Sequence, residues 1–350
     1  MKYLLPLLLA LVACKTPPPA PASPVLPPGS LLPDLTAEQR TLAERGKALF
    51  GKRYTVAEGL GPYFNHPACG DCHDKPASGG HGDLQHVARN TVVDGDVGGV
   101  QFNAIPGFAP LTVKPGAAVT LPTPPPLYGL GLLEAIDEAM LEKSCGNHPP
   151  DGVHGIANVN AGVKRMSRFG LKGHAVTVRD FAANALNLEM GMTNPYERDA
   201  RLAKDADGVP DPEVPAADVD AIVAYVKALA PPSPPPPDAK GEQTFATLGC
   251  AHCHRPETGP QARAYTDLCL HDMGPEFDNK MQDFKATGTM WRTRPLWGLR
   301  WRDLYLHDGR TQDLATAIRV HGGEATAARD RFDKLPQAER DAFLAWLRTL

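Results

Sequence analysis

The chain of 350 residues lacks an excess of basic residues, with 36 Lys and Arg against 40 Asp and Glu and a formal net charge of −4. No basic block is present, so we do not expect nucleic-acid binding. Long apolar runs are also missing, because the run at residues 3–10 is too short to span a bilayer. Strand patterns are sparse, which favours a mainly helical protein with long loops.

The first residues are typical of an export signal. Met1-Lys2 is positively charged, an apolar run follows, and Leu11–Cys14 has the form of a lipobox. We expect residues 1–13 to be a lipoprotein signal peptide and Cys14 to carry the lipid. Lys15, in place of an aspartate, favours the periplasmic face of the outer membrane. A plain secretory signal with a chance cysteine is the alternative, and both signals export the chain.

Four of the seven cysteines stand in two Cys-x-x-Cys-His motifs. The motifs are Cys69, Cys72 and His73, and Cys250, Cys253 and His254. In such a motif the thiols add to the vinyl groups of haem and the histidine binds the iron. A zinc site would leave the histidine after both cysteine pairs unexplained, and no βαβ pattern supports a thioredoxin-like pair. The sequence therefore predicts two covalently attached c-type haems.

Proline-rich segments divide the chain. We expect residues 14–37 to form an extended tether. We expect residues 231–237 to form a linker between two domains, at 38–230 and 238–350. Each domain opens with a helical segment, continues with a haem motif and loops, and closes with an amphipathic helix, which is the order of a small cytochrome c domain. The predicted fold is mainly α, with two cytochrome c-like domains whose long loops each surround one covalently bound haem. Residues 117–121 predict a strand of a short hairpin.

Cys145 and Cys269 stand outside the haem motifs. Exported chains favour disulfides, so we expect the two to pair and to tie the domains together. A free reactive thiol is the alternative.

Several blocks of sequence resemble the di-haem oxidoreductase family, which is related to bacterial di-haem cytochrome c peroxidases. The blocks are Gly59–Asn65, Gly129–Ile136, Arg168–Lys172, Glu189–Met192, Tyr265–Asp267 with Leu270–Gly274, Trp291–Gly298, Leu306–Arg310 and Ala317–Ala325. The resemblance covers about residues 42–350. It implies reduction of peroxide at the N-terminal haem. Electrons would pass through the C-terminal haem from a small donor protein of the cytochrome c or cupredoxin type.

The resemblance also implies roles for residues at the N-terminal haem. Glu189 matches a distal glutamate that would act as acid and base, and Arg89 would stabilise developing charge. His81 matches a distal histidine that is a candidate iron ligand, with His86 as the alternative. Glu134 is a second candidate for the acid.

At the C-terminal haem, His321 stands where the related peroxidases have a distal methionine, 14 residues after His307. We therefore expect His254 and His321 to bind this iron, with Met273 as the alternative ligand. Histidine in this place lowers the haem potential relative to methionine. His307 is expected to pack near the haem propionates.

Other features leave alternatives open. Trp291 and Trp297 follow the second haem loop and are candidates for an electron relay between the haems. The weak Asp-Gly segment at Asp151-Gly152 leaves a bound calcium possible but unsupported. Besides a peroxidase, the sequence allows a pure electron carrier whose two irons each have two protein ligands. It also allows a haem enzyme that oxidises protein or small-molecule substrates.

Overall fold

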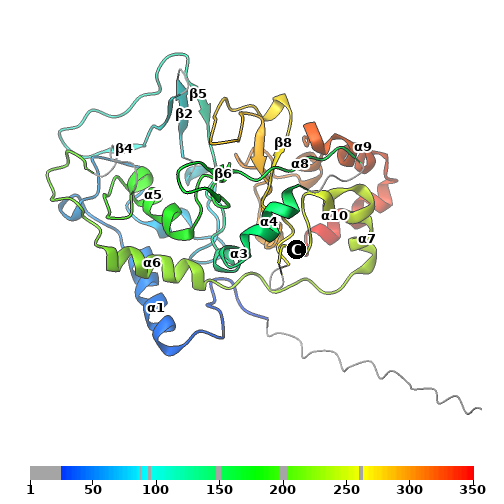
Figure 1. Cartoon of the computed structure of the whole chain (residues 1–350), viewed down its shortest axis with the longest axis horizontal. Helices are drawn as coiled ribbons and strands as arrows, with labels where there is room; N and C mark the ends of the chain where they lie inside the picture. The colour runs from blue at the N-terminus through cyan, green and yellow to red at the C-terminus, as the bar shows by residue number, and fades with distance from the viewer. Residues whose placement is uncertain (1–24, 87, 94–95, 147–150, 198–203, 260–262) are drawn as a thin grey trace, which may run out of the picture.

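The structure is a computed structural model that describes residues 25–86, 88–93, 96–146, 151–197, 204–259 and 263–350. It is rich in helices that are joined by long loops (Figure 1). The helices are α1 (Ala37–Gly51), α2 (Cys69–Cys72), α3 (Leu130–Glu134), α4 (Glu138–Cys145), α5 (Val178–Met190), α6 (Ala216–Ala228), α7 (Ala239–Leu248), α8 (Leu314–Arg319), α9 (Thr326–Lys334) and α10 (Gln337–Leu347). None of the described helices has the length and apolar character needed to cross a bilayer.

The strands are short and form small antiparallel sheets. They are β1 (Tyr63–Phe64), β2 (Asn90–Val93), β3 (Asp96–Gly99), β4 (Asn103–Ala104), β5 (Ala118–Thr120), β6 (Val159–Asn160), β7 (Arg165–Met166), β8 (Leu270–Asp272) and β9 (Met290–Arg292). The described sheets have the orders β1-β4, β3-β2-β5, β6-β7 and β8-β9. The predicted strand at 117–121 is present as β5, but it pairs with β2 at the edge of a sheet and not in a hairpin of its own.

Buried apolar side chains form two clusters. The first includes Phe50, Leu186, Met190, Met192, Ile222 and Tyr225, and the second includes Phe245, Leu314, Phe332, Phe343 and Trp346. In the first cluster α1 packs against α6 at Gly46, where an added Cβ would lie 1.8 Å from the carbonyl oxygen of Ala221. Glycine therefore allows the two helices to approach closely.

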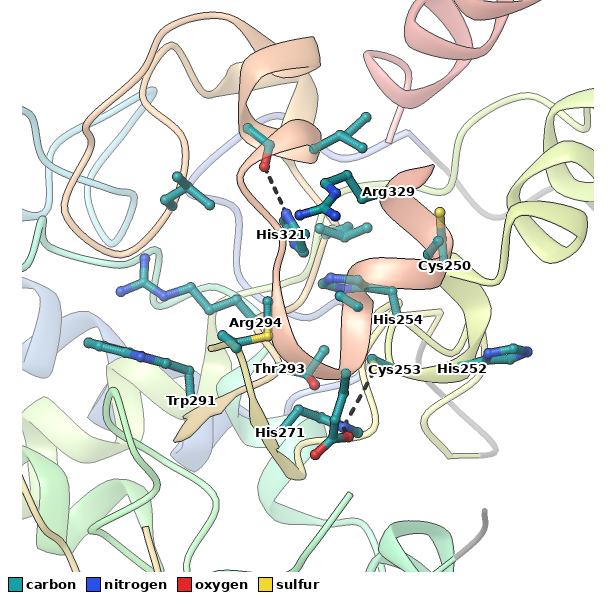
Figure 2. Close-up of a pocket in the computed structure, with 18 of the residues that line it drawn as sticks. Cys250, His252, Cys253, His254, His271, Trp291, Thr293, Arg294, His321 and Arg329 are labelled. Carbon is teal, nitrogen blue, oxygen red and sulfur yellow. Dashed lines mark hydrogen bonds and ion pairs between the residues drawn. The ribbon is translucent and has the colours of Figure 1, made fainter. Parts of the chain in front are cut away.

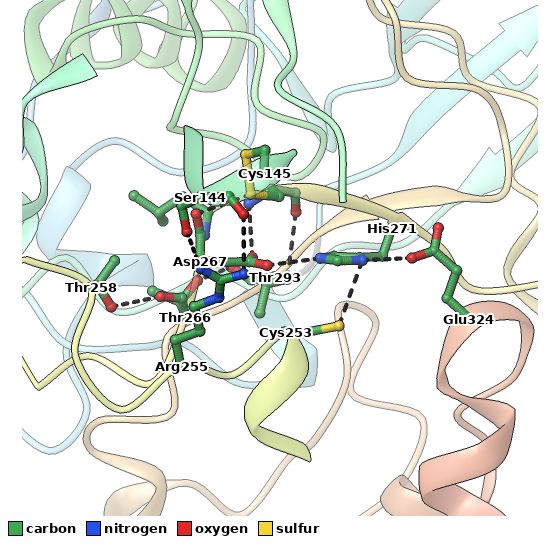
Figure 3. Close-up of a disulfide and its surroundings, with 12 residues drawn as sticks. Ser144, Cys145, Cys253, Arg255, Thr258, Thr266, Asp267, His271, Thr293 and Glu324 are labelled. Atoms are coloured by element: carbon green, nitrogen blue, oxygen red, sulfur yellow. Dashed lines mark hydrogen bonds and ion pairs between the residues drawn. A yellow bond between two sulfur atoms is a disulfide. The ribbon is translucent and has the colours of Figure 1, made fainter. Parts of the chain in front are cut away.

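The two halves of the chain are linked by a disulfide. Cys145, at the end of α4, is bonded to Cys269, which precedes β8, and their Cα atoms are 5.5 Å apart. Beside it, the Arg255 guanidinium donates a hydrogen bond of 2.6 Å to the Ser144 hydroxyl (Figure 3). Cys269 and Trp297 pack into the first apolar cluster although both belong to the second half. The halves therefore share buried surface as well as a covalent link.

The described part of the expected tether is held against the body. The Leu32 amide donates to the carbonyl of Ala228 at 2.8 Å, and the Ala230 amide donates to the carbonyl of Ser30 at 2.9 Å. Leu31 also packs against the first apolar cluster. The chain is therefore not a free extended tether over this stretch, because it offers apolar side chains and backbone partners to the end of α6. Cys14 and the signal peptide lie outside the described residues.

Candidate functional site

The C-terminal haem motif forms a 3₁₀ turn, η3 (Cys250–His252), that continues into Cys253 and His254. Nδ1 of His254 lies 3.1 Å from the carbonyl oxygen of Tyr265. A neutral imidazole that donates this hydrogen bond has its Nε2 free. Burial lowers the pKa of His254 to about 4, so the ring is neutral at pH 7. A neutral, oriented imidazole with a free Nε2 fits an iron ligand.

A second histidine lies in the cavity that contains this motif. His321 follows α8, and its Nδ1 is 2.7 Å from the carbonyl oxygen of Ala317. This hydrogen bond orients the imidazole ring. Burial lowers the pKa of His321, and a charge on His321 would lower the pKa of His254. Figure 2 shows the two rings in the same part of the cavity. Met273 also lines the cavity. The structure thus brings together His254 and both candidates for the second ligand.

The other walls of this cavity suit a large flat group with carboxylates. The ring of Trp291 stacks on that of His307, with centroids 3.7 Å apart. Both terminal nitrogens of Arg294 are buried, and neither has a hydrogen-bond partner among the described residues. A buried guanidinium without a partner is costly, and a carboxylate would satisfy it. The residues present therefore fit a haem.

A buried group of charged side chains, centred on His271, lies beside the C-terminal motif. Nε2 of His271 is 2.9 Å from Oδ2 of Asp267, and its Nδ1 is 2.8 Å from Oε2 of Glu324 (Figure 3). Sγ of Cys253 lies 3.5 Å from the same Nδ1. Burial alone would lower the pKa of His271, but hydrogen bonds to Asp267, Cys253 and Glu324 raise it to about 12. His271 is therefore held in its charged form beside Cys253 of the C-terminal motif.

The N-terminal motif has the same local geometry. Cys69 and Cys72 begin and end α2, and Nδ1 of His73 is 3.1 Å from the carbonyl oxygen of Gly80. Burial lowers the pKa of His73 to about 4, which keeps the ring neutral. Sγ of Cys69 lies 3.9 Å from Sδ of Met190 at the end of α5. Helix α5 therefore lies against this motif.

Glu189 is the last residue but one of α5. Thr177 caps the start of the helix, and Gly191 ends it with a φ of 70°, at a point where an added Cβ would lie 2.5 Å from the carbonyl oxygen of Gly61. The Glu189 carboxylate accepts a hydrogen bond from the Asn65 amide, and its charge acts on Cys72. Burial raises the pKa of Glu189. The structure thus places a carboxyl group with a raised pKa beside the N-terminal motif.

Two other predicted groups at this end have identifiable contacts. The Arg89 guanidinium lies over the ring of Phe102, 4.1 Å from its centroid, and its buried Nε has no hydrogen-bond partner among the residues that the structure describes. The Phe102 amide donates to Asn65, the partner of Glu189, but no hydrogen bond in the described parts of the chain joins Arg89 to Glu189 directly. Glu134 accepts from the amide of Val178 at 2.6 Å and is therefore occupied at the start of α5.

The two candidate distal histidines, His81 and His86, differ in the contacts of their ring nitrogens. His81 has Nδ1 3.0 Å from the carbonyl oxygen of Gly82 and Nε2 3.0 Å from that of Trp301, so neither ring nitrogen is free for iron in this arrangement. Nδ1 of His86 lies 3.1 Å from Oδ1 of Asp83, and a charge on His86 would lower the pKa of His73. Its ring is 5.1 Å from that of His66, a residue that the sequence did not single out.

The tryptophans are placed differently from one another. Trp291 lines the C-terminal cavity and donates to the carbonyl of Phe277 at 2.9 Å, and the Lys172 ammonium of the first half lies 4.4 Å from its ring centroid. Trp297 packs against Gly129 of the first half. Trp301, which the sequence analysis did not select, has its ring 5.7 Å from Tyr128, and its carbonyl oxygen is the one near His81. Trp301, which belongs to the second half, therefore contacts two residues of the first half.

Acidic residues that could hold a cation lie away from the segment considered first. Asp151 pairs with Arg331 and is therefore occupied. Asp205, Asp211 and Glu213, in the loop before α6, bring carboxylate oxygens within 4.8 Å of one another. Among the described residues, this is the group whose geometry could hold a divalent cation.

Comparisons with known proteins give a family. The sequence profile described as "Di-haem oxidoreductase, putative peroxidase" matches residues 113–350. No curated protein matches the chain. The chain is similar to the hydrazine synthase of Kuenenia stuttgartiensis, at 12% identity and a TM-score of 0.47 over 97% of this chain and 99% of that chain. It is also similar to the diheme peroxidase BthA of Burkholderia thailandensis, at 16% identity and a TM-score of 0.45 over 89% and 86%. With TM-scores below 0.5, these structural likenesses carry no argument about function.

Proposed function

Because this chain belongs to the di-haem oxidoreductase family, we propose that it is a c-type cytochrome enzyme that reduces peroxide at its N-terminal haem. The C-terminal haem would supply electrons. The observation that carries the proposal is the difference between the two motifs. His254 shares its cavity with a second oriented histidine, whereas Glu189, with a raised pKa, lies near Cys72. One site then suits electron transfer and the other suits proton transfer to a small oxidant.

We expect both haems to be covalently attached, each through the two thiols of its motif. A pyridine haemochrome assay should give about two haems per chain, and haem stain should remain on the denatured chain in a gel. Replacing Cys250 and Cys253 by alanine should remove only the C-terminal haem and leave about one per chain. A chain that purifies without haem, or that loses all of it on denaturation, would contradict the proposal.

The residues around the N-terminal motif define a mechanism. The bound haem would supply the redox chemistry, held by Cys69, Cys72 and His73. Glu189 takes a proton from peroxide and returns it to the leaving oxygen, for which a carboxyl group with a raised pKa is suited. The Asn65 amide holds the carboxylate in place through its hydrogen bond. Arg89 supplies positive charge to the oxygen that becomes negative.

The contacts between the halves suggest where electrons pass. The carbonyl of Gly80 holds His73, the next residue is His81, and His81 contacts the carbonyl oxygen of Trp301. Arg302, which follows Trp301, lines the C-terminal cavity. We therefore replace the earlier candidates Trp291 and Trp297 with Trp301 as the residue between the two haem sites. His81 then acts in the contact between the halves and not as an iron ligand.

His321 should be the second ligand of the C-terminal iron. We expect His321→Ala to leave this haem attached, to change its ferric form from low-spin to high-spin, and to raise its reduction potential. Electron paramagnetic resonance and a redox titration of the haem-loaded variant check both changes. Met273→Leu, in the same cavity, is the matched control and should keep the wild-type spectrum. The reverse result would make Met273 the ligand.

An electron carrier remains the second candidate because of His66 and His86. Their rings are 5.1 Å apart, and His86 is close enough to influence His73. A histidine that bound the N-terminal iron as a second protein ligand would prevent peroxide from reaching it. The ferric protein would then show two low-spin haems and no turnover.

The proposed peroxidase activity also implies an electron donor. A small electron-donor protein, of the cytochrome c or cupredoxin type, would refill the C-terminal haem. The lipobox at Leu11–Cys14 supports an exported chain with a lipid on Cys14, held at the periplasmic face of the outer membrane. The enzyme would then meet its donor and its oxidant in the periplasm.

A further inference from the structure

We propose that Arg294, assisted by Arg302, binds a propionate of the C-terminal haem and turns the propionate edge of that haem towards the first half of the chain. This inference rests on the attachment of haem to Cys250 and Cys253 proposed above. It does not depend on peroxide turnover. The ligand is a carboxylate, and the site that recognises it is a buried pair of guanidinium groups.

The first observation concerns the terminal nitrogens of Arg294. Its two terminal nitrogens are buried in the C-terminal cavity without a hydrogen-bond partner among the described residues. Burial, with the charges of Arg302 and Arg292 close by, lowers the pKa of Arg294 to about 9, so the group stays charged at pH 7. A buried cation is stable only when an anion or several acceptors satisfy it. A bidentate contact with a carboxylate is the arrangement that guanidinium favours most.

The second observation is that neighbouring cations in the described structure already have partners. Arg292 donates to the carbonyl of Gly170 at 2.8 Å. Arg329, near His321 in the same cavity, pairs with Asp330 at 2.9 Å. Lys172 donates to the carbonyls of Thr287, Gly288 and Met290. Arg294 differs from these three cations because its terminal N–H groups have no acceptor among the described residues.

The third observation is where Arg294 lies. Figure 2 shows Cys250 and Arg294 on opposite sides of His254 and His321. In haem the vinyl and propionate groups occupy opposite edges of the ring. With the vinyl edge bonded to the cysteines, the propionate edge falls on the side of Arg294. The backbone there is fixed, because the Thr293 amide donates to the Cys269 carbonyl at 2.9 Å and its own carbonyl accepts from the Thr266 hydroxyl at 2.7 Å.

The same side of the cavity faces the first half of the chain. Tyr128 of the first half lies close enough to Arg302 that its charge would raise the pKa of Arg302, which burial lowers. Trp301, the residue before Arg302, contacts Tyr128 and His81. The propionate edge would therefore point to the contact between the halves, along the path that we propose for electrons.

The test is Arg294→Gln in the full-length, haem-loaded protein. The haem count should stay at the wild-type value, since the cysteines hold the haem. Loss of the positive charge should favour the ferric C-terminal haem by about tenfold, which is about 59 mV for one electron. The freed propionate should also titrate, so the potential should vary with pH where that of the wild type is flat. Arg294→Lys keeps the charge and should restore most of the potential.

Two controls separate the alternatives. Arg329→Gln removes the same charge from the same cavity, but its guanidinium already has a partner, and the pH dependence of the potential should stay that of the wild type. Wild-type protein should have the same potential in phosphate and in chloride at equal ionic strength. A dependence on phosphate would mean that Arg294 binds a free anion, and an unchanged potential in Arg294→Gln would remove its role. Both results overturn the propionate assignment while leaving two attached haems.

Discussion

Replacing Glu189 by glutamine should slow peroxide consumption by about 100- to 10,000-fold, the usual cost of losing a positioned acid–base group. Glutamine keeps the shape of the side chain and can still contact Asn65, so both haems should remain attached. It cannot accept a proton from peroxide and return it. The measurement is the rate of peroxide consumption by wild type and variant, with the reduction state of the C-terminal haem matched in both.

The matched control is Glu142→Gln. Glu142 is an exposed carboxylate on α4, and its loss should leave the rate within about twofold of wild type. Glu189→Asp should recover part of the rate, because it keeps a carboxyl group at a shorter reach. A Glu189→Gln protein that turns over at the wild-type rate would assign proton transfer to another group.

The second large effect is expected on stability. Cys145 and Cys269 are 124 residues apart, and closing a loop of about 100 residues stabilises a folded chain by about 4.7 kcal/mol in the chain-entropy model. The double variant Cys145→Ala, Cys269→Ala should therefore unfold at a clearly lower denaturant concentration than wild type. Its haem content should be unchanged, because the four haem cysteines are separate from this pair.

The readout for the disulfide is the denaturant midpoint followed by haem absorbance and by tryptophan fluorescence. Wild-type protein whose Cys145–Cys269 bond has been reduced should show the same fall as the double variant. Each single variant leaves one buried thiol and should match the double variant, because the loss lies in the cross-link. Equal midpoints for wild type and the double variant would show that the shared apolar surface alone joins the halves.

The sequence was most informative where chemistry fixes the spacing of residues. The haem motifs have their proximal histidines oriented by backbone carbonyls, and His321 lies in the same cavity as His254. Helix-rich structure with small sheets also agrees with the sparse strand patterns. These features depend on local sequence or on blocks shared with a family.

The disulfide between Cys145 and Cys269 was predicted and is confirmed, but most other contacts between distant segments could not be predicted from the sequence. Nothing in the sequence indicates that His81 contacts the carbonyl of Trp301, 220 residues away, or that Glu134 accepts a hydrogen bond from the Val178 amide at the start of α5. For the same reason Trp301 was missed, because its position between the halves exists only after folding. That the terminal nitrogens of Arg294 have no hydrogen-bond partner in the described part of the chain is likewise visible only once the surrounding side chains are placed.

The central claim is that the N-terminal haem reduces peroxide and the C-terminal haem supplies electrons. The most direct test measures peroxide consumption by the haem-loaded protein in its fully oxidised and half-reduced forms, beside free haem at the same concentration. We predict that the half-reduced protein consumes peroxide much faster than free haem and reoxidises its C-terminal haem as it does so. Consumption no faster than free haem in either form would contradict the claim and would identify the protein as an electron carrier.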